Sequence, residues 1–112
     1  MNISVREHIV RIQIIEISGR LDASEVARLR AEQERLLSNG TSQFVVDLSN
    51  TNFMDSAGMS ALVSLLKRAR QLNGDVVLVK PVDAAAYRIL SLTRFDQVFK
   101  MADTIDLAIK HF

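Results

Sequence analysis

Hydrophobic and polar residues alternate in the first strongly patterned segment of the chain, from Ile9 to Ile17. A period of two residues is typical of a β-strand with one buried face. The alternation slips by one residue at Ile14-Ile15, which indicates a bulge or a change of buried face. Ile3 and Val5 suggest a further strand before this one, and Gly19 marks the turn that follows.

The next segment has the spacing of an amphipathic helix. Asp22 and Glu25 stand three residues apart, as in a capping box, with Asp in place of the usual Ser or Thr. Apolar residues then recur at helical spacing until Asn39-Gly40, where a helix can end. The apolar positions of this predicted helix are Val26, Leu29, Leu36 and Leu37.

Two compact apolar runs, from Phe44 to Leu48 and from Val76 to Val79, predict strands that are covered on both faces. Between them lies a second helical stripe, which closes at Asn73-Gly74, where Gly easily adopts a left-handed cap. The buried face predicted for this second helix consists of Met59, Leu62, Val63, Leu66 and Ala69.

In the last third of the chain, Asp83 can cap a helix that runs through Leu92. A short strand is expected near Val98-Phe99, and a final helix from Asp103 to Lys110 with Asp103 as its cap. The predicted element order is therefore ββαβαβαβα. Such alternation is typical of the α/β class, so we expect one mixed β-sheet packed against α-helices.

The chain has 112 residues, of which 48% are hydrophobic and 24% are charged, so we expect a single globular domain over residues 1–112. A net charge of +1 provides no strong field for nucleic acid. The absence of cysteine excludes disulfides, thiolate metal sites and thiol catalysis, and fits the reducing cytoplasm. The longest apolar runs have four residues, so we expect neither export nor membrane insertion.

An aspartate and a serine stand at the start of the predicted second helix, at Asp55 and Ser56. The first turn of a helix has unpaired backbone N–H groups and the positive end of the helix dipole. One of these two residues can therefore simply cap the helix, or Ser56 can carry a phosphate that the N–H groups stabilise.

The same helix has a polar side, on which Ser56, Ser60, Ser64 and Lys67 follow one another at helical spacing. Short serine side chains allow another protein to approach the helix backbone closely, although a merely solvated helix face has a similar composition.

Three segments, in order along the chain, resemble the sequence pattern of STAS domains and, among these, of the bacterial anti-sigma-factor antagonists. Asp55 to Met59 is similar to the family's Asp-Ser-(Ser/Thr)-Gly-Leu, Ser18 to Asp22 to its Gly-Glu-Leu-Asp turn, and Ile89 to Thr93 to its Leu-x-x-Thr-Gly helix end. Ala57 leaves Ser56 as the only hydroxyl of the first motif. The chain departs from the pattern at Met59-Ser60, where Leu-Gly is usual, and at Arg94, which replaces the Gly after the Thr.

The resemblance implies a phosphorylation-controlled regulatory protein, with no enzyme activity and no cofactor of its own. In the family, an anti-sigma factor with serine kinase activity uses ATP to phosphorylate the serine that follows the Asp, here Ser56. The unphosphorylated form binds the anti-sigma factor and releases a sigma factor, and a phosphoserine phosphatase restores that form. The partner-binding residues that the resemblance implies are Asp22, Ser24, Asp55, Ser56, Ala57, Gly58, Met59, Ser60 and Ser64.

Two alternatives give the protein another role. The first keeps the STAS fold but changes the partner, and the second is a receiver domain, which is phosphorylated on an aspartate. STAS proteins also serve as subunits of lipid-transport ABC systems or in stress-signalling complexes, and adjacent genes would distinguish these from the first interpretation. A receiver domain would use Asp47 as its phosphoacceptor and Lys80-Pro81 as its Lys-Pro pair. A receiver also needs an acidic pair after its first strand to hold Mg²⁺, whereas this chain has Ser18-Gly19-Arg20 there.

A serine hydrolase is a third alternative, with Ser56 as its nucleophile. The nucleophile elbow requires Gly two residues before the Ser, and Met54 stands there. The two histidines, His8 and His111, lie near the chain ends rather than near a general-base position. The aspartates are also widely separated, so we expect caps and loop roles for them rather than a metal site.

Overall fold

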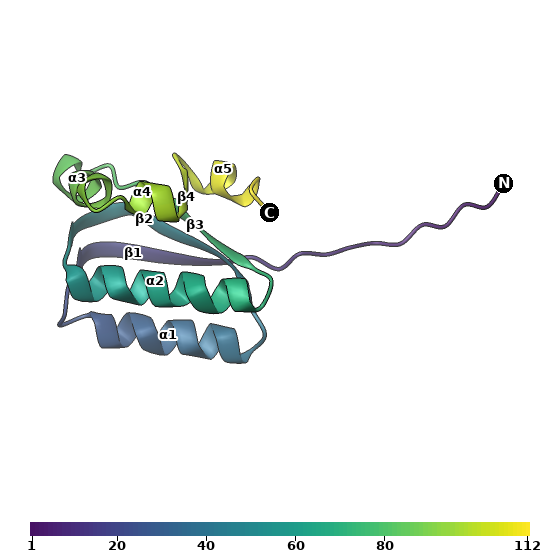
Figure 1. Ribbon diagram of the computed structural model, residues 1–112, viewed down its shortest axis with the longest axis horizontal. Coiled ribbons are helices and arrows are strands. Elements are labelled where there is room, and N and C mark those ends of the chain that lie inside the picture. The colour runs from purple at the N-terminus through teal and green to yellow at the C-terminus, as the bar shows by residue number, and fades with distance from the viewer.

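Four parallel strands form one sheet in the order β1-β2-β3-β4 in the computed structural model, which describes residues 1–112 (Figure 1). The helices lie between successive strands and after the last one, so the predicted α/β class is confirmed. The elements are β1 (Gln13–Leu21), α1 (Val26–Ser38), β2 (Gln43–Met54), α2 (Ser56–Gln71), β3 (Asp75–Val79), α3 (Ala84–Leu92), α4 (Phe95–Val98), β4 (Lys100–Ala102) and α5 (Ile105–Ile109).

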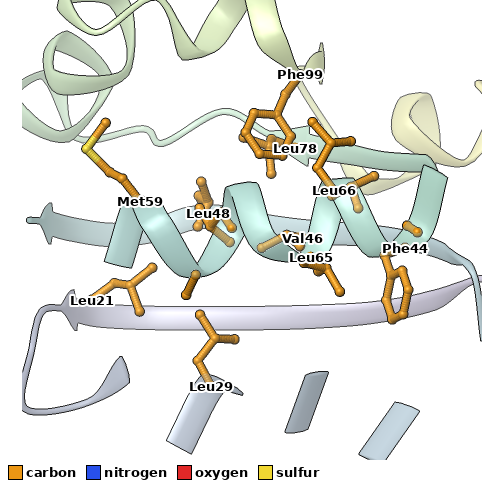
Figure 2. Packing of buried hydrophobic residues seen from close by; sticks show 14 of the residues in the cluster. Leu21, Leu29, Phe44, Val46, Leu48, Met59, Leu65, Leu66, Leu78 and Phe99 are labelled. Carbon is orange, nitrogen blue, oxygen red and sulfur yellow. The ribbon is translucent and has the colours of Figure 1, made fainter. Parts of the chain in front are cut away.

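The sheet is buried on both faces because alternate residues of its central strands point to opposite sides. Phe44 and Val46 of β2 belong to the larger core cluster, which α1 and α2 cover, whereas Val45 belongs to a smaller cluster that includes Ala108 of α5. Figure 2 shows Leu21, Met59 and other apolar side chains filling the space around α2 and the strands. The two buried runs of the sequence thus form strands covered on both faces, as predicted.

The strand expected at Ile3 and Val5 is absent, and the sheet is therefore parallel throughout rather than mixed. Residues 1–12 form no strand, and the two side chains are 77% and 90% exposed. In Figure 1 this segment leads away from the sheet. The residues from Arg6 to Ile9 include no Gly, Pro, Asn or Asp, so nothing in the sequence favours the tight reversal that an antiparallel partner for β1 requires.

The first strand begins and ends later than predicted, since β1 covers Gln13–Leu21 and not Ile9 to Ile17. Gly19, expected as a turn, lies inside β1 with φ of 80° and accommodates a register shift there instead of ending the strand. The irregularity expected at Ile14-Ile15 is absent, because both residues stay in register with β2. β2 also continues past the predicted end at Leu48 to Met54.

Three further boundaries also differ from the prediction. α1 begins at Val26, with no side-chain cap on it, because the Asp22 carboxylate bonds to Ser24 in a local turn instead of capping the helix. Thr104, and not Asp103, caps α5 by accepting from the Leu107 N–H at 3.1 Å. The residues expected as a strand near Val98-Phe99 close the short helix α4, and β4 follows directly after them.

The end of α2 lies at the predicted place but for another reason. Asn73, and not Gly74, has the left-handed conformation, with φ of 63°. Gly74 is instead packed tightly, because a Cβ atom there would lie only 1.7 Å from the carbonyl oxygen of Ser42. Glycine is therefore needed at this position for close contact between the α2–β3 turn and the start of β2.

The end of α3 contains a strained residue at the position where the family pattern has Gly. Arg94 follows the C-cap Thr93 and has φ of 60° and ψ of 27°, a left-handed conformation that costs a non-glycine residue about 1–2 kcal/mol. We expect Arg94→Gly to raise the free energy of unfolding by about 0.5–1 kcal/mol, because glycine adopts this conformation without strain but loses more entropy on folding. Urea unfolding followed by circular dichroism measures the difference.

The matched control for this substitution is Arg88→Gly, which introduces the same residue inside α3. There the helix needs ordinary helical angles, so we expect a loss of about 1 kcal/mol. Equal losses in both variants would contradict the assignment of strain to Arg94.

Candidate functional site

The carboxyl ends of β1 and β2 lie side by side and position the residues that follow them. Because the two strands are parallel, Leu21 pairs with Met54, and the loop after β1 meets the start of α2 at the same edge of the sheet. The backbone N–H of Asp55 donates to the Leu21 carbonyl oxygen at 3.3 Å. Ala23 and Asp55, which lie 32 positions apart in the sequence, are thereby brought into contact.

Asp55 joins the two segments and caps α2. Its Oδ1 accepts from the Gly58 N–H at 3.0 Å, which is the N-cap hydrogen bond, and its Oδ2 accepts from the Ala23 N–H at 2.9 Å. Both carboxylate oxygens are therefore used within the chain. Of the two capping residues that the sequence allowed, Asp55 is the cap.

Ser56 is the first residue of α2, and its side chain is exposed. Since Asp55 already satisfies the capping position, the Ser56 hydroxyl is not needed to hold the helix start. It stands next to the unpaired backbone donors of the first turn, where an anion is stabilised by the helix dipole. The geometry leaves this hydroxyl available for chemical modification.

Asp22 organises the loop after β1. Its Oδ1 accepts from the Ser24 backbone N–H at 3.0 Å and from the Ser24 hydroxyl at 2.6 Å, and its Oδ2 accepts from Arg20 Nε at 3.2 Å. Hydrogen bonds from Ser24 and Arg20 lower the pKa of the Asp22 carboxyl below its ordinary value. Asp22 and Ser24 thus lie at the site, but their mutual contacts hold the loop in shape.

Gly58 and Met59 support the site from beneath. Gly58 is buried against the Leu21 backbone, and a Cβ atom there would lie 2.5 Å from the Leu21 carbonyl oxygen. Met59 is only 9% exposed and belongs to the main core (Figure 2). Both were expected among the partner-binding residues, but Gly58 has no side chain to offer and the side chain of Met59 is buried in the core.

The polar side of α2 extends away from Ser56 as the helical spacing predicted. Ser60 and Lys67 are exposed, and Ser64 and Ala57 are partly exposed. The buried residues of the helix lie on its opposite side, among them Ala61, Leu62 and Leu65. The surface next to Ser56 is therefore low and polar, so a partner can approach the helix closely.

Arg20 and Phe53 are part of the site that the sequence did not reveal. The Arg20 guanidinium lies over the Phe53 ring, with its central carbon 4.0 Å from the ring centroid, while its Nε bonds to Asp22. The two residues are paired in the β1–β2 register. That pairing depends on two register shifts between β1 and β2, at each of which β2 has one residue more than β1, and no sequence signal marks where they fall.

The sheet order excludes the receiver alternative. A receiver-type doubly wound sheet has its first strand in the interior, whereas β1 lies at the edge and pairs only with β2. Asp47 is buried and accepts from the Ser49 N–H at 3.0 Å, and Lys80 pairs with Asp103 at 3.3 Å.

None of the helices is both long and apolar enough to cross a membrane.

Comparison with known proteins places this chain in a family. The sequence model of the STAS domain matches residues 3–108. The chain is 26% identical over 106 residues to the anti-sigma F factor antagonist of Paenibacillus polymyxa, an alignment that covers 92% of this chain and 89% of that protein.

Solved structures agree with the sequence match. A candidate anti-sigma factor antagonist from Thermotoga maritima has a TM-score of 0.82 and 26% identity, with 89% of this chain and 86% of that one covered. The Bacillus cell-fate determinant SpoIIAA in its phosphorylated form has a TM-score of 0.70 and 20% identity, with 94% and 95% covered. The chain therefore belongs to the STAS domain family.

Proposed function

We propose that this chain is an anti-sigma factor antagonist, acting over residues 1–112 as a single STAS domain. Relatives and structural neighbours that cover most of the chain carry that name, and it denotes a regulatory binding protein rather than an enzyme. The proposal places the protein in the cytoplasm, where sigma factors act, and gives it no cofactor of its own.

The observation that carries the proposal is the exposed Ser56 hydroxyl beside an aspartate that already caps the helix. A helix start normally uses its first hydroxyl or carboxylate for capping. Here Asp55 accepts the Gly58 N–H, so Ser56 can gain or lose a phosphate without loss of the cap. This arrangement suits a residue that is modified reversibly.

Phosphorylation of Ser56 would act on the docking surface and not on the fold. A phosphate adds about −1.5 to −2 charges at neutral pH, directly beside the Asp55 carboxylate. In the free protein the backbone donors of α2 and water can accommodate that charge, whereas a packed interface would have to bury it at a cost of several kcal/mol. SpoIIAA, which has this fold, has been solved in both its unphosphorylated and its phosphorylated form.

In this scheme the partner is an anti-sigma factor with serine kinase activity, which supplies ATP and transfers its phosphate to Ser56. The unphosphorylated chain competes with a sigma factor for that partner. A phosphoserine phosphatase returns the chain to its binding form. Asp22, Ser24, Ala57, Ser60 and Ser64 then form the surface around Ser56 that the partner contacts.

The test is release of sigma factor from a purified complex. A candidate anti-sigma factor is taken from a gene adjacent to that of this chain or is captured from lysate. It is first bound to its sigma factor, and the present chain is then added. We expect the unphosphorylated chain to release the sigma factor and the chain phosphorylated on Ser56 to leave the complex intact. If both forms leave the complex unchanged, with an anti-sigma factor that binds this chain, the proposed function is wrong.

A further inference from the structure

Arg20 is held in one position beside the site and yet retains free hydrogen-bond donors. Its guanidinium lies over the Phe53 ring at 4.0 Å, and Nε donates to Asp22 at 3.2 Å. The side chain is nevertheless 60% exposed. Only Nε is hydrogen-bonded within the chain, so the two terminal nitrogens point their donors at solvent.

The two aspartates of the site differ from Arg20 in this respect. Asp55 accepts one backbone N–H on each oxygen, from Gly58 and Ala23. Asp22 accepts from Ser24 on one oxygen and from Arg20 on the other. Their hydrogen-bonding capacity is largely used inside the chain. Of the three charged residues Arg20, Asp22 and Asp55, Arg20 therefore keeps the most free hydrogen-bonding capacity for another molecule.

We propose that Arg20 is a specificity-determining residue of the docking surface and that it binds a carboxylate side chain of the anti-sigma factor. The inference rests on the proposed function and names the chemistry that the partner must present.

The geometry favours a carboxylate over other acceptors. A guanidinium presents parallel N–H donors that match the two oxygens of a carboxylate, and its planar shape allows one edge to bind while the face stacks on an aromatic ring. Asp22 occupies the Nε position, and Phe53 covers one face. The terminal pair of nitrogens remains as the free edge. Because the contacts already fix the side chain, little conformational entropy is lost when a partner binds.

A surface groove adjoins this edge and gives the partner room. It lies between β1 and α1, has a volume of about 530 Å³, and is lined by apolar residues such as Ile17 and Leu29, by four acidic residues and by Arg20 and Arg28. Three of the acidic residues are already paired with arginines, Asp22 with Arg20, Glu25 with Arg28 and Glu32 with Arg35, and the fourth is Glu16. A partner segment that carries a carboxylate and rests on this groove would meet the free donors of Arg20.

The experiment measures binding of the anti-sigma factor from the sigma-release assay to four variants by titration calorimetry without nucleotide. We expect Arg20→Gln to weaken binding about tenfold and Arg20→Glu about 100-fold or more, since the latter sets two carboxylates against each other. Arg20→Lys keeps the charge but lacks the forked donors, so we expect an intermediate loss. The control Arg30→Gln removes an exposed arginine on α1 and should change affinity by less than about twofold.

Two further readouts separate an interface role from a structural one. Circular dichroism must give the wild-type spectrum for each variant, and the salt dependence of affinity should be weaker in Arg20→Gln than in the wild type. If folded Arg20→Glu binds as tightly as the wild type, the inference is wrong. A parallel titration is made with a non-hydrolysable ATP analogue on the partner. If the Arg20 variants lose affinity only with that analogue present, the anion is a nucleotide phosphate and the carboxylate assignment is wrong.

Ser56→Asp, measured in the same series, distinguishes this inference from the proposed function. Loss of binding in Ser56→Asp together with full binding in Arg20→Glu overturns the role of Arg20 and leaves the phosphorylation switch standing. Loss of binding in Arg20→Glu together with full binding in Ser56→Asp overturns the switch and leaves Arg20 in the interface.

Discussion

Replacing Ser56 with aspartate will weaken binding of the anti-sigma factor by about 100-fold or more, because it places an unpaired charge in a packed interface. The fold should stay intact. An anion in the first turn of a helix gains about 0.3–1 kcal/mol from the helix dipole, and repulsion from the Asp55 carboxylate offsets part of that gain. Thermal unfolding and titration with the partner, on one preparation, measure the two effects separately.

Ser56→Asn is the matched control, since it has nearly the same size as aspartate but no charge. We expect it to bind within a few-fold of the wild type. Equal loss of binding in both variants would show that bulk and not charge disrupts the interface. A large loss of stability in Ser56→Asp would mean that the charge acts by local unfolding, contrary to the proposed switch.

Gly58→Ala will destabilise the domain by about 1–3 kcal/mol through overpacking beneath the site. In an open helix the same change would stabilise the chain by up to about 1 kcal/mol, so the contact decides the sign of the effect. The added methyl group would lie 2.5 Å from the Leu21 carbonyl oxygen and 2.7 Å from its Cγ atom. Either α2 or the end of β1 must move, which also strains the hydrogen bond from the Ala23 N–H to the Asp55 carboxylate.

Urea unfolding of Gly58→Ala beside Ser60→Ala checks this expectation. Ser60 is exposed two positions further along α2, so its replacement should change the free energy of unfolding by less than about 0.5 kcal/mol. Stabilisation of Gly58→Ala would contradict the close packing between α2 and Leu21.

The central strands and α2 could be predicted from sequence because burial imposes a repeating pattern on them. β3 and the first half of β2 are covered on both faces and consist of apolar runs, broken in β2 only by Asp47, and α2 carries an apolar stripe with a period near 3.6 residues. Ile3 and Val5 have a comparable local pattern. A strand also needs a partner, however, and whether the chain turns back to supply one is not encoded in two apolar residues.

Helix starts were harder to predict because neighbouring polar residues compete for the same backbone donors. Asp22 bonds to Ser24 instead of capping α1, and Thr104 caps α5 although Asp103 precedes it. At α2 the competition was between Asp55 and Ser56, and it was left open by the sequence. Alternative capping residues differ by about 1 kcal/mol in the helix stability they provide, which is less than tertiary contacts contribute.

The motif around Ser56 could be found from sequence, whereas the position of Arg20 at the site could not. Asp55 and Ser56 are adjacent, so their spacing is visible in the chain. Arg20 reaches the site through its pairing with Phe53, which follows from the two register shifts between β1 and β2. A one-residue change in that register would turn Arg20 to the other face of the sheet.

Mass spectrometry of the chain after incubation with the anti-sigma factor kinase and ATP will show whether Ser56 is the residue that is phosphorylated. We expect one phosphoryl group, located on Ser56, stable to hydroxylamine, and absent from Ser56→Ala but present in the control Ser60→Ala. A full phosphoryl load on Ser56→Ala, or a hydroxylamine-labile group on Asp47, would contradict this expectation.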